Sequence, residues 1–118
     1  MPQTRQPVPQ HRRGRPWLAL LLLALAPGLA TAGDAAAGRT RAQQCIACHG
    51  QLGLSQNPGA PNLAGQPAIY LVEQLRAFRS GKRQHQVMSL IAKPLKDDEI
   101  ADLAAWYASL EVSVKAPD

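Results

Sequence analysis

The sequence predicts an all-α domain built from three main helices. After residue 33 the chain shows no strand-like alternation of apolar and polar side chains. Three segments of this part place apolar residues at helical spacing, between residues that typically begin and end helices. Only four aromatic side chains follow residue 32, so we expect a cofactor to complete a core this small.

The first helix is expected over about 34–47, and the second from Pro67 to Ser80. Asp34 is a good N-cap, and its negative charge suits the positive end of the helix dipole. Proline is favoured in the first turn of a helix, and Gly81 is typical of a helix end. The apolar face of the second helix has the spacing i, i+4 and i+7: Leu71, Leu75 and Phe78.

The third helix is expected over about 98–110. Its apolar stripe contains Ile100, Leu103, Ala104, Tyr107 and Leu110. Leu95 and Ile100 are placed to form a hydrophobic staple across the start of this helix. Two irregular stretches, 50–66 and 82–96, separate the three helices and are long for a compact domain, so we expect both to line a site.

Residues 1–32 have the pattern of a secretory signal, which leaves 33–118 as the mature domain. Four arginines precede the apolar stretch 17–26, and Ala30-Thr31-Ala32 follows it as a candidate cleavage site. A helix of ten residues is roughly 15 Å long, too short for a hydrocarbon core of about 30 Å. An uncleaved N-terminal anchor and a twin-arginine signal are the alternatives. The domain is therefore expected to be exported, to the periplasm of a bacterium.

The charge of the chain does not indicate nucleic-acid binding. The chain has 118 residues, which suits one small domain rather than a multi-domain enzyme, and a formal charge of +5. Four of its 13 basic residues precede the apolar stretch, and the remainder of the chain is close to neutral at +1. A basic surface for DNA or RNA is therefore not expected in the mature domain.

The strongest motif is C-x-x-C-H at 45–49, the attachment pattern of a c-type haem. Cys45 and Cys48 are one helical turn apart and can form thioethers with the two vinyl groups of one porphyrin, while His49 supplies the proximal imidazole. Three alternatives stay open. A thioredoxin-like redox pair would need a βαβ context, a zinc site would need a fourth ligand such as His85, and the match could be accidental.

Met88 is the strongest candidate for the second axial ligand of the iron. It is the only methionine after the signal, and it lies in the expected irregular stretch rather than in a helical stripe. His85 is the rival ligand, and an open sixth position is the remaining alternative. Because two protein ligands leave no site for substrate, the pattern favours electron transfer over catalysis. The alternative function is a haem protein with a labile sixth ligand that binds small ligands or acts like a peroxidase.

The chain resembles small bacterial class I cytochromes c, of the type that also occurs as a tandem domain in two-haem periplasmic cytochromes. The resemblance covers nearly all of 33–118. The matching stretches are GDAAAGRTRAQQCIACHG from residue 33, GAPNLAGQ at 59–66, YLVEQLRAFRSGKR at 70–83, and MSLIAKPLKDDEIADLAAWYASL from residue 88. It implies three main helices packed around one covalently attached haem c, with Cys45 and Cys48 holding it and His49 and Met88 binding iron.

The same resemblance implies supporting roles for other residues. The carbonyl of Pro61 would accept a hydrogen bond from the free nitrogen of His49. Leu63 and Leu75 would pack on the porphyrin, and Gly38 would allow the first and last helices to approach closely, next to Trp106 or Tyr107. Lys96 departs from the family, which usually has Ser or Thr as the N-cap at this helix start. Asp97 is therefore expected to cap one residue later, or the first turn is expected to fray.

The charges of the last third of the chain are segregated. From residue 74 to 96 there are six basic residues and no acidic one, and from 97 to 118 there are six acidic residues and one basic one. The basic segment brackets Met88, and it is expected either to steer an acidic redox partner or to be an ordinary solvated surface. Contact with a membrane is expected only through an uncleaved signal or a membrane-bound redox complex.

Overall fold

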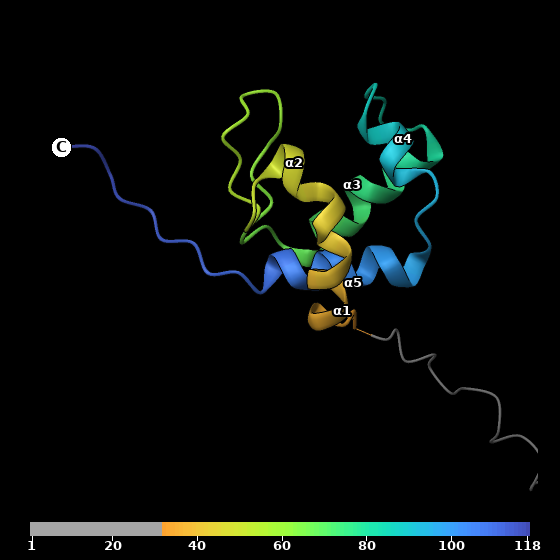
Figure 1. The fold of residues 1–118 in the computed structure, drawn as a ribbon, viewed down its shortest axis with the longest axis horizontal. Helices are drawn as coiled ribbons and strands as arrows, with labels where there is room; N and C mark the ends of the chain where they lie inside the picture. Colours follow the sequence, from red (N-terminus) through yellow and green to blue (C-terminus); the bar gives the residue numbers. More distant parts are fainter. Residues whose placement is uncertain (1–31) are drawn as a thin grey trace, which may run out of the picture. The chain divides into compact units, whose positions relative to one another are not determined.

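The structure is a computed structural model that describes residues 32–118. Its elements are the α-helices α1 (Ala35–Arg41), α2 (Ile46–His49), α3 (Ala68–Ser80), α4 (Met88–Ala92) and α5 (Asp97–Ala108), with a 3₁₀ segment (Ala42–Cys45) between α1 and α2 (Figure 1). No strand occurs among these residues, which confirms the all-α fold class. The expected signal, 1–32, lies outside the described residues except for its last position. Within the described part, no helix is long and apolar enough to cross a membrane.

The first expected helix is divided into three successive segments. The prediction of one continuous helix over 34–47 was wrong, because a 3₁₀ segment separates α1 from α2. A 3₁₀ segment has 3.0 residues per turn instead of 3.6, so it changes the direction in which the following side chains point. Apolar spacing alone does not distinguish the two kinds of turn in a short, alanine-rich stretch.

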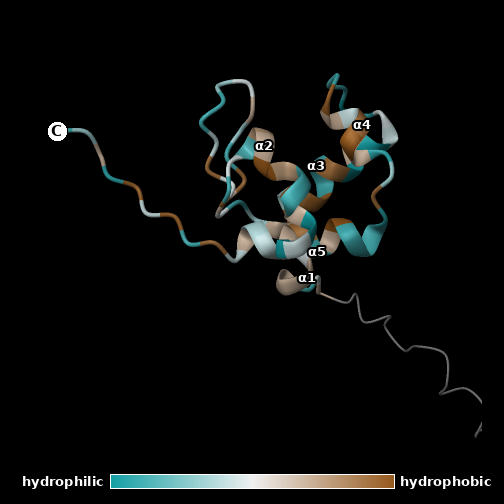
Figure 2. Ribbon diagram, viewed as in Figure 1, coloured by the Kyte–Doolittle hydropathy of each residue, from teal (hydrophilic) through white to brown (hydrophobic). Residues whose placement is uncertain are grey.

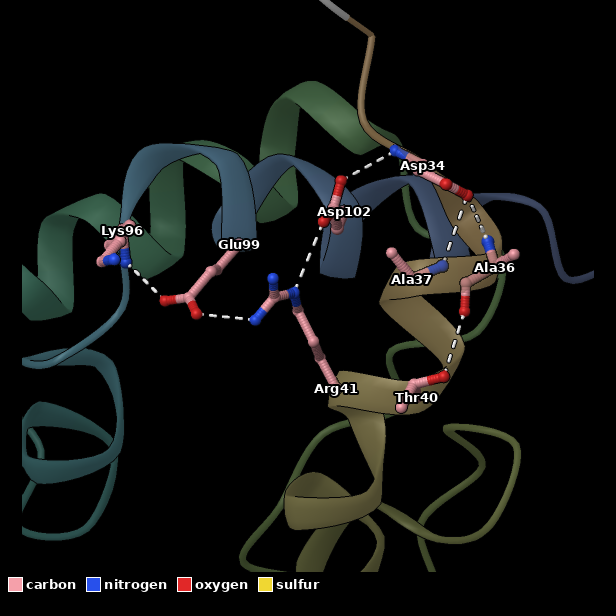
Figure 3. Close-up of polar contacts among 8 residues, drawn as sticks. All are labelled: Asp34, Ala36, Ala37, Thr40, Arg41, Lys96, Glu99 and Asp102. Atoms are coloured by element: carbon pink, nitrogen blue, oxygen red, sulfur yellow. Dashed lines mark hydrogen bonds and ion pairs between the residues drawn. The ribbon is translucent and has the colours of Figure 1, made fainter.

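The start of α1 is fixed by Asp34, as expected. Its carboxylate accepts hydrogen bonds from the backbone N–H groups two and three residues later, at 2.8 Å from Ala36 and 3.3 Å from Ala37 (Figure 3). Its own backbone N–H donates to the carboxylate of Asp102 on α5, at 2.8 Å. The cap therefore also attaches the beginning of α1 to α5.

α1 crosses α5 at close range (Figure 1). A Cβ atom on Gly38 would overlap the backbone carbonyl of Asp102 and come within 2.8 Å of the Cβ of Trp106, so the expected close approach at Gly38 is confirmed, with Trp106 as the neighbour. Beside this crossing, Arg41 donates to Glu99 at 2.6 Å and to Asp102 at 3.4 Å (Figure 3). Steric fit and a half-buried ion-pair cluster thus hold the two helices together.

α3 has nearly the expected bounds. Pro67 precedes its first residue, and Gly81 ends it in the left-handed conformation with φ 80°. The apolar face predicted from the spacing is directed inward, because Leu71 and Phe78 are buried and Leu75 is half-buried. The sequence signals at both ends of this helix were therefore sufficient to place it.

α5 begins one residue earlier than expected, and the expected Asp97 cap is wrong. Lys96 occupies the N-cap position without a side-chain hydrogen bond to the helix. The carboxylate of Glu99 accepts a hydrogen bond from the backbone N–H of Lys96 at 2.9 Å. This is one of the two hydrogen bonds of a capping box, and it does not require a side-chain oxygen on the N-cap residue. Leu95 and Ile100, on either side of this start, are both buried in the core, which confirms the hydrophobic staple.

The core is small and lies where α3 and α5 meet the 3₁₀ segment. Its buried members are Ala42, Leu71, Leu95, Ile100, Leu103, Ala104 and Tyr107. Among residues 32–118, only Ile100 is both large and fully enclosed, whereas several apolar side chains remain open, among them Ile69 at 72 % exposure and Leu90 at 70 %. Figure 2 shows apolar residues on the ribbons of α3 and α4. The chain alone therefore leaves much of its apolar surface uncovered.

Candidate haem site

The two cysteines and the adjacent histidine lie on the 3₁₀ segment and α2. Cys45 is the last residue of the 3₁₀ segment and is half-buried, whereas Cys48 on α2 is exposed, and both thiols are free. Cys48 borders a hollow of ≈ 430 Å³ between α2 and the loop that follows it. His49 ends α2 and is 6 % exposed. The helical turn thus keeps the three residues of the motif together.

The imidazole of His49 is held by the backbone of the next loop. Its Nδ1 lies 2.8 Å from the carbonyl oxygen of Pro61. Because a carbonyl can only accept, Nδ1 carries the proton and Nε2 keeps a free lone pair. Nε2 has no hydrogen-bond partner among residues 32–118. Every fully enclosed polar side-chain atom in that part of the chain has a partner, so Nε2 must be at least partly open. This is the tautomer that an axial imidazole needs.

The loop between α2 and Pro61 is tied back to α2. Ser55 donates its hydroxyl to the carbonyl of Cys48 at 2.9 Å, and its backbone N–H donates to the side-chain oxygen of Asn62 at 2.7 Å. The carbonyl of Gly53 accepts from the backbone N–H of Leu63 at 2.7 Å. The loop closes on itself around His49, and these bonds fix the carbonyl that the imidazole contacts.

The sequence reasoning missed Gly53, Ser55 and Asn62. Gly53 has φ 73°, and a Cβ atom there would come within 2.8 Å of the ring of Tyr107, so only glycine allows the loop to lie against α5. The signal that could have found this position is the pair of glycines, at 50 and 53, directly after the motif. Ser55 carries no comparable signal, because polar residues are common in any loop. Asn62 lies in the stretch 59–66 that the family resemblance matched, but no role was assigned to it.

Cys45 is directed toward the core, next to Tyr107. Burial raises the pKa of the Cys45 thiol, and contact with the Tyr107 hydroxyl lowers it by a smaller amount. Burial likewise raises the pKa of Tyr107, so the phenol is protonated at neutral pH. A reactive C-x-x-C thiol has a lowered pKa instead, and the βαβ context of a thioredoxin-like site is missing from the described part of the chain.

A zinc site is also not supported by the arrangement. Within residues 32–118, no group of three or more His, Cys, Asp or Glu side chains is placed to hold a metal ion. His85, the fourth ligand that a zinc site would require, directs its Nδ1 at backbone N–H groups of its own segment. The residues of the motif therefore do not form a tetrahedral metal site in the described part of the chain.

Met88 is half-buried at the first position of α4. The expectation that 82–96 is irregular throughout was wrong, because α4 occupies 88–92. The lack of a standard capping residue before Met88 concealed this helix in the sequence. Leu63 and Leu75 are both half-buried and pack against the margin of the core. Their roles toward a porphyrin remain predictions.

The residues present fit a covalently held haem. Two free thiols lie one helical turn apart, and the neighbouring histidine has an orientated ring with one unused nitrogen. Half-buried leucines and exposed apolar side chains offer surface that a large apolar ring would cover. A model of the cytochrome c family matches residues 35–111.

The chain belongs to the cytochrome c family. It is 44% identical over 102 residues to cytochrome c4 of Pseudomonas aeruginosa, covering 86% of this chain and 51% of that protein. It is 46% identical over 83 residues to cytochrome c-554(548) of Halomonas halodenitrificans, covering 68% of this chain and all of that protein. The resemblance to class I cytochromes c inferred from the sequence is therefore confirmed.

A solved structure supports the same fold. The crystal structure of reduced recombinant cytochrome c4 from Pseudomonas stutzeri matches with a TM-score of 0.67 and 38% identity, over 74% of this chain and 50% of that one. The chain thus spans about half the length of the cytochromes c4 that it matches. The all-α class I cytochrome c fold is confirmed by this likeness.

The basic segment of this cytochrome c domain is partly neutralised. Of its six basic residues, Arg76 and Arg79 pair with Asp97 at 3.4 and 2.6 Å. This pairing lowers the pKa of the Asp97 carboxyl, chiefly through the hydrogen bond from Arg79. The other four make no ion pair within residues 32–118, and all are exposed; we call them the basic rim: Lys82, Arg83, Lys93 and Lys96. The rim flanks α4.

Proposed function

We propose that this chain is a one-electron carrier with one covalently bound haem c. Cys45 and Cys48 would hold the haem through thioethers, and His49 and Met88 would be its axial ligands. When bound, the haem iron supplies a couple between Fe(III) and Fe(II). The sequence contains a single C-x-x-C-H motif, which supports one haem for this chain. The observation that carries the proposal is the buried His49, whose ring is fixed at Nδ1 and unused at Nε2.

The residues around His49 would keep the axial bond in one orientation. The carbonyl of Pro61 fixes the rotation of the imidazole and increases its basicity through the Nδ1 hydrogen bond. Leu63 and Leu75 would cover the porphyrin from the margin of the core, where both are half-buried. Apolar cover excludes water and so reduces the change in solvation that accompanies a change in charge.

Two axial ligands from the protein favour electron transfer over catalysis. With His49 and Met88 both bound, no position on the iron is open to substrate, and no described residue is assigned acid–base or nucleophilic chemistry. The alternative is a haem protein that binds small ligands or acts like a peroxidase, in which Met88 leaves the iron easily. The two functions differ in how readily an external ligand reaches the reduced protein.

The proposal is tested on the full chain, purified from a host that has the machinery for covalent haem attachment. Intact mass and a pyridine haemochrome spectrum measure covalent haem, and a redox titration with the near-infrared Fe(III)–S(Met) band measures the axial ligand. We expect one haem per chain and slow carbon monoxide binding in the wild type. Met88→Ala should lose the band, bind carbon monoxide quickly and lower the potential by roughly 0.1 V or more, within the span that axial ligands control. An unchanged band in Met88→Ala would show that the axial assignment is wrong.

We further propose that the carrier works in the periplasm with an acidic redox partner. The pattern of residues 1–32 supports export, and the basic rim supports docking of a partner that carries carboxylates near its own redox centre. Cell fractionation with N-terminal sequencing of the mature protein tests export. A mature protein that begins at residue 1 in the cytoplasm would overturn it.

A further inference from the structure

The start of α4 lacks the usual cap but is not left without acceptors. The first backbone N–H groups of a helix have no partner within the helix. Here the N–H groups of Val87, just before the helix, and of Met88, its first residue, both donate to Nδ1 of His85, at 3.3 and 3.2 Å. These donors are two and three residues after the acceptor, which is the pattern of an Asx-type cap. An imidazole nitrogen occupies the place where an asparagine oxygen is usual.

The same segment closes on itself from the other direction. The backbone N–H of His85 donates to Oγ of Ser89 at 3.1 Å, and the backbone N–H of Ser89 donates to the carbonyl of His85 at 3.0 Å. Met88 lies inside this closed turn. The position of its backbone therefore depends on contacts made by His85.

The exposed imidazole also contacts α3 along one edge. Its ring lies edge-on to Phe78, with ring centroids 6.5 Å apart and an interplanar angle of 73°. Phe78 is buried, and the guanidinium of Arg83 lies 4.6 Å from the centre of its ring. Because the same ring accepts the two N–H groups and contacts Phe78, rotation of the His85 ring would disturb both the cap and the aromatic contact.

We infer that His85 is the positioning residue for Met88, and that its Nδ1, as a hydrogen-bond acceptor, holds the start of α4 where the thioether can reach the iron. The inference rests on the proposed function, since it requires Met88 to be an axial ligand. It also assigns the tautomer of His85, because a nitrogen that accepts two N–H groups carries no proton, and the ring proton is then on Nε2. His85 thus supports the methionine ligand instead of competing with it.

Two variants of the haem-loaded protein separate the cap from the ring. His85→Phe keeps an aromatic ring against Phe78 but removes the acceptor. His85→Asn removes the ring but keeps an acceptor at the same number of bonds from the backbone. The probe is free imidazole, which binds ferric iron only when the methionine sulfur leaves. We expect His85→Phe to bind imidazole about five- to tenfold more tightly than wild type, the range that corresponds to losing a helix cap, and to weaken the near-infrared band. His85→Asn should remain close to wild type.

The matched control is Asp34→Ala, because Asp34 caps α1 with the same spacing of two and three residues. It should lower the unfolding temperature without changing the affinity for imidazole. If it raises the affinity as much as His85→Phe does, general destabilisation explains the effect and the inference is overturned. Wild-type behaviour of His85→Phe, with the band lost only in Met88→Ala, would overturn the inference and leave the proposed function intact. A wild-type holoprotein without the band would instead overturn both.

Discussion

The contact between α1 and α5 and the contact between α3 and α4 are stabilised in different ways. The α1–α5 contact is stabilised by the close approach of the two backbones at Gly38 and by the ion pairs of Arg41 with Glu99 and Asp102. The second has no ion pair between its two helices in the described residues, and Leu90 of α4 and Val87 just before it are exposed. The comparison indicates that the α1–α5 side is held by direct contacts of the chain, whereas the α3–α4 side leaves apolar surface that a bound haem would cover.

Removing a thioether should have the largest effect, because it removes a covalent bond to the cofactor that the α3–α4 side would pack against. We expect Cys45→Ala to lose most of its covalent haem, because the remaining thiol can form only one of the two bonds. Intact mass and pyridine haemochrome spectra of purified protein measure the loss. Ala47→Ser, an exposed position between the two cysteines, is the control and should keep its haem. Full haem content in Cys45→Ala would contradict the assignment of this thiol.

A bulkier residue at Gly38 should act on the other side. Gly38→Val would force the α1–α5 crossing apart, because its Cβ overlaps the carbonyl of Asp102, and should cost about 3 kcal/mol of unfolding free energy, the upper end of the overpacking range. Gly81→Ala is the comparison, since nothing lies within 4 Å of a Cβ there and only the φ of 80° opposes it. That change should cost about 1 kcal/mol. Denaturant unfolding of the holoproteins measures both values, and equal losses would contradict the special role of the crossing.

Charge reversal at the basic rim should have the smallest effect. Lys93→Glu should slow electron transfer to an acidic partner at low salt by a few-fold, and the difference should vanish as salt is added, because exposed charges are screened. Lys115→Glu, outside the rim, should change the rate less. Stopped-flow mixing over a range of ionic strength tests this. A wild-type rate that does not fall with salt would reject steering and leave the rim as an ordinary solvated surface.

Sequence reasoning located the elements whose signals are local. Asp34 as a cap, Gly81 as a helix end and the staple between Leu95 and Ile100 all follow from nearest neighbours along the chain, and the structure has each of them. The 3₁₀ segment was missed, because its hydrogen bonds shift by one residue without any change in apolar pattern. α4 was missed because its capping group is a histidine, which usual capping preferences do not include.

The site was predicted less evenly than the fold. The thiols and His49 follow from a short motif, and Pro61 followed only from the family resemblance, yet the structure brings its carbonyl to His49. The contribution of Gly53 depends on a ring from α5 that is far away in sequence, so no local pattern could indicate it. His85 was considered as a ligand because of its residue type, whereas in the structure its Nδ1 accepts backbone N–H groups at the start of α4.

The closed loop around His49 has a consequence for assembly. Because Ser55, Asn62 and Gly53 order the loop through the chain's own hydrogen bonds, the carbonyl of Pro61 is held beside Nδ1 of the imidazole. The entropy of ordering that ring is lost when the loop folds, so an axial bond made by His49 would not carry that cost itself.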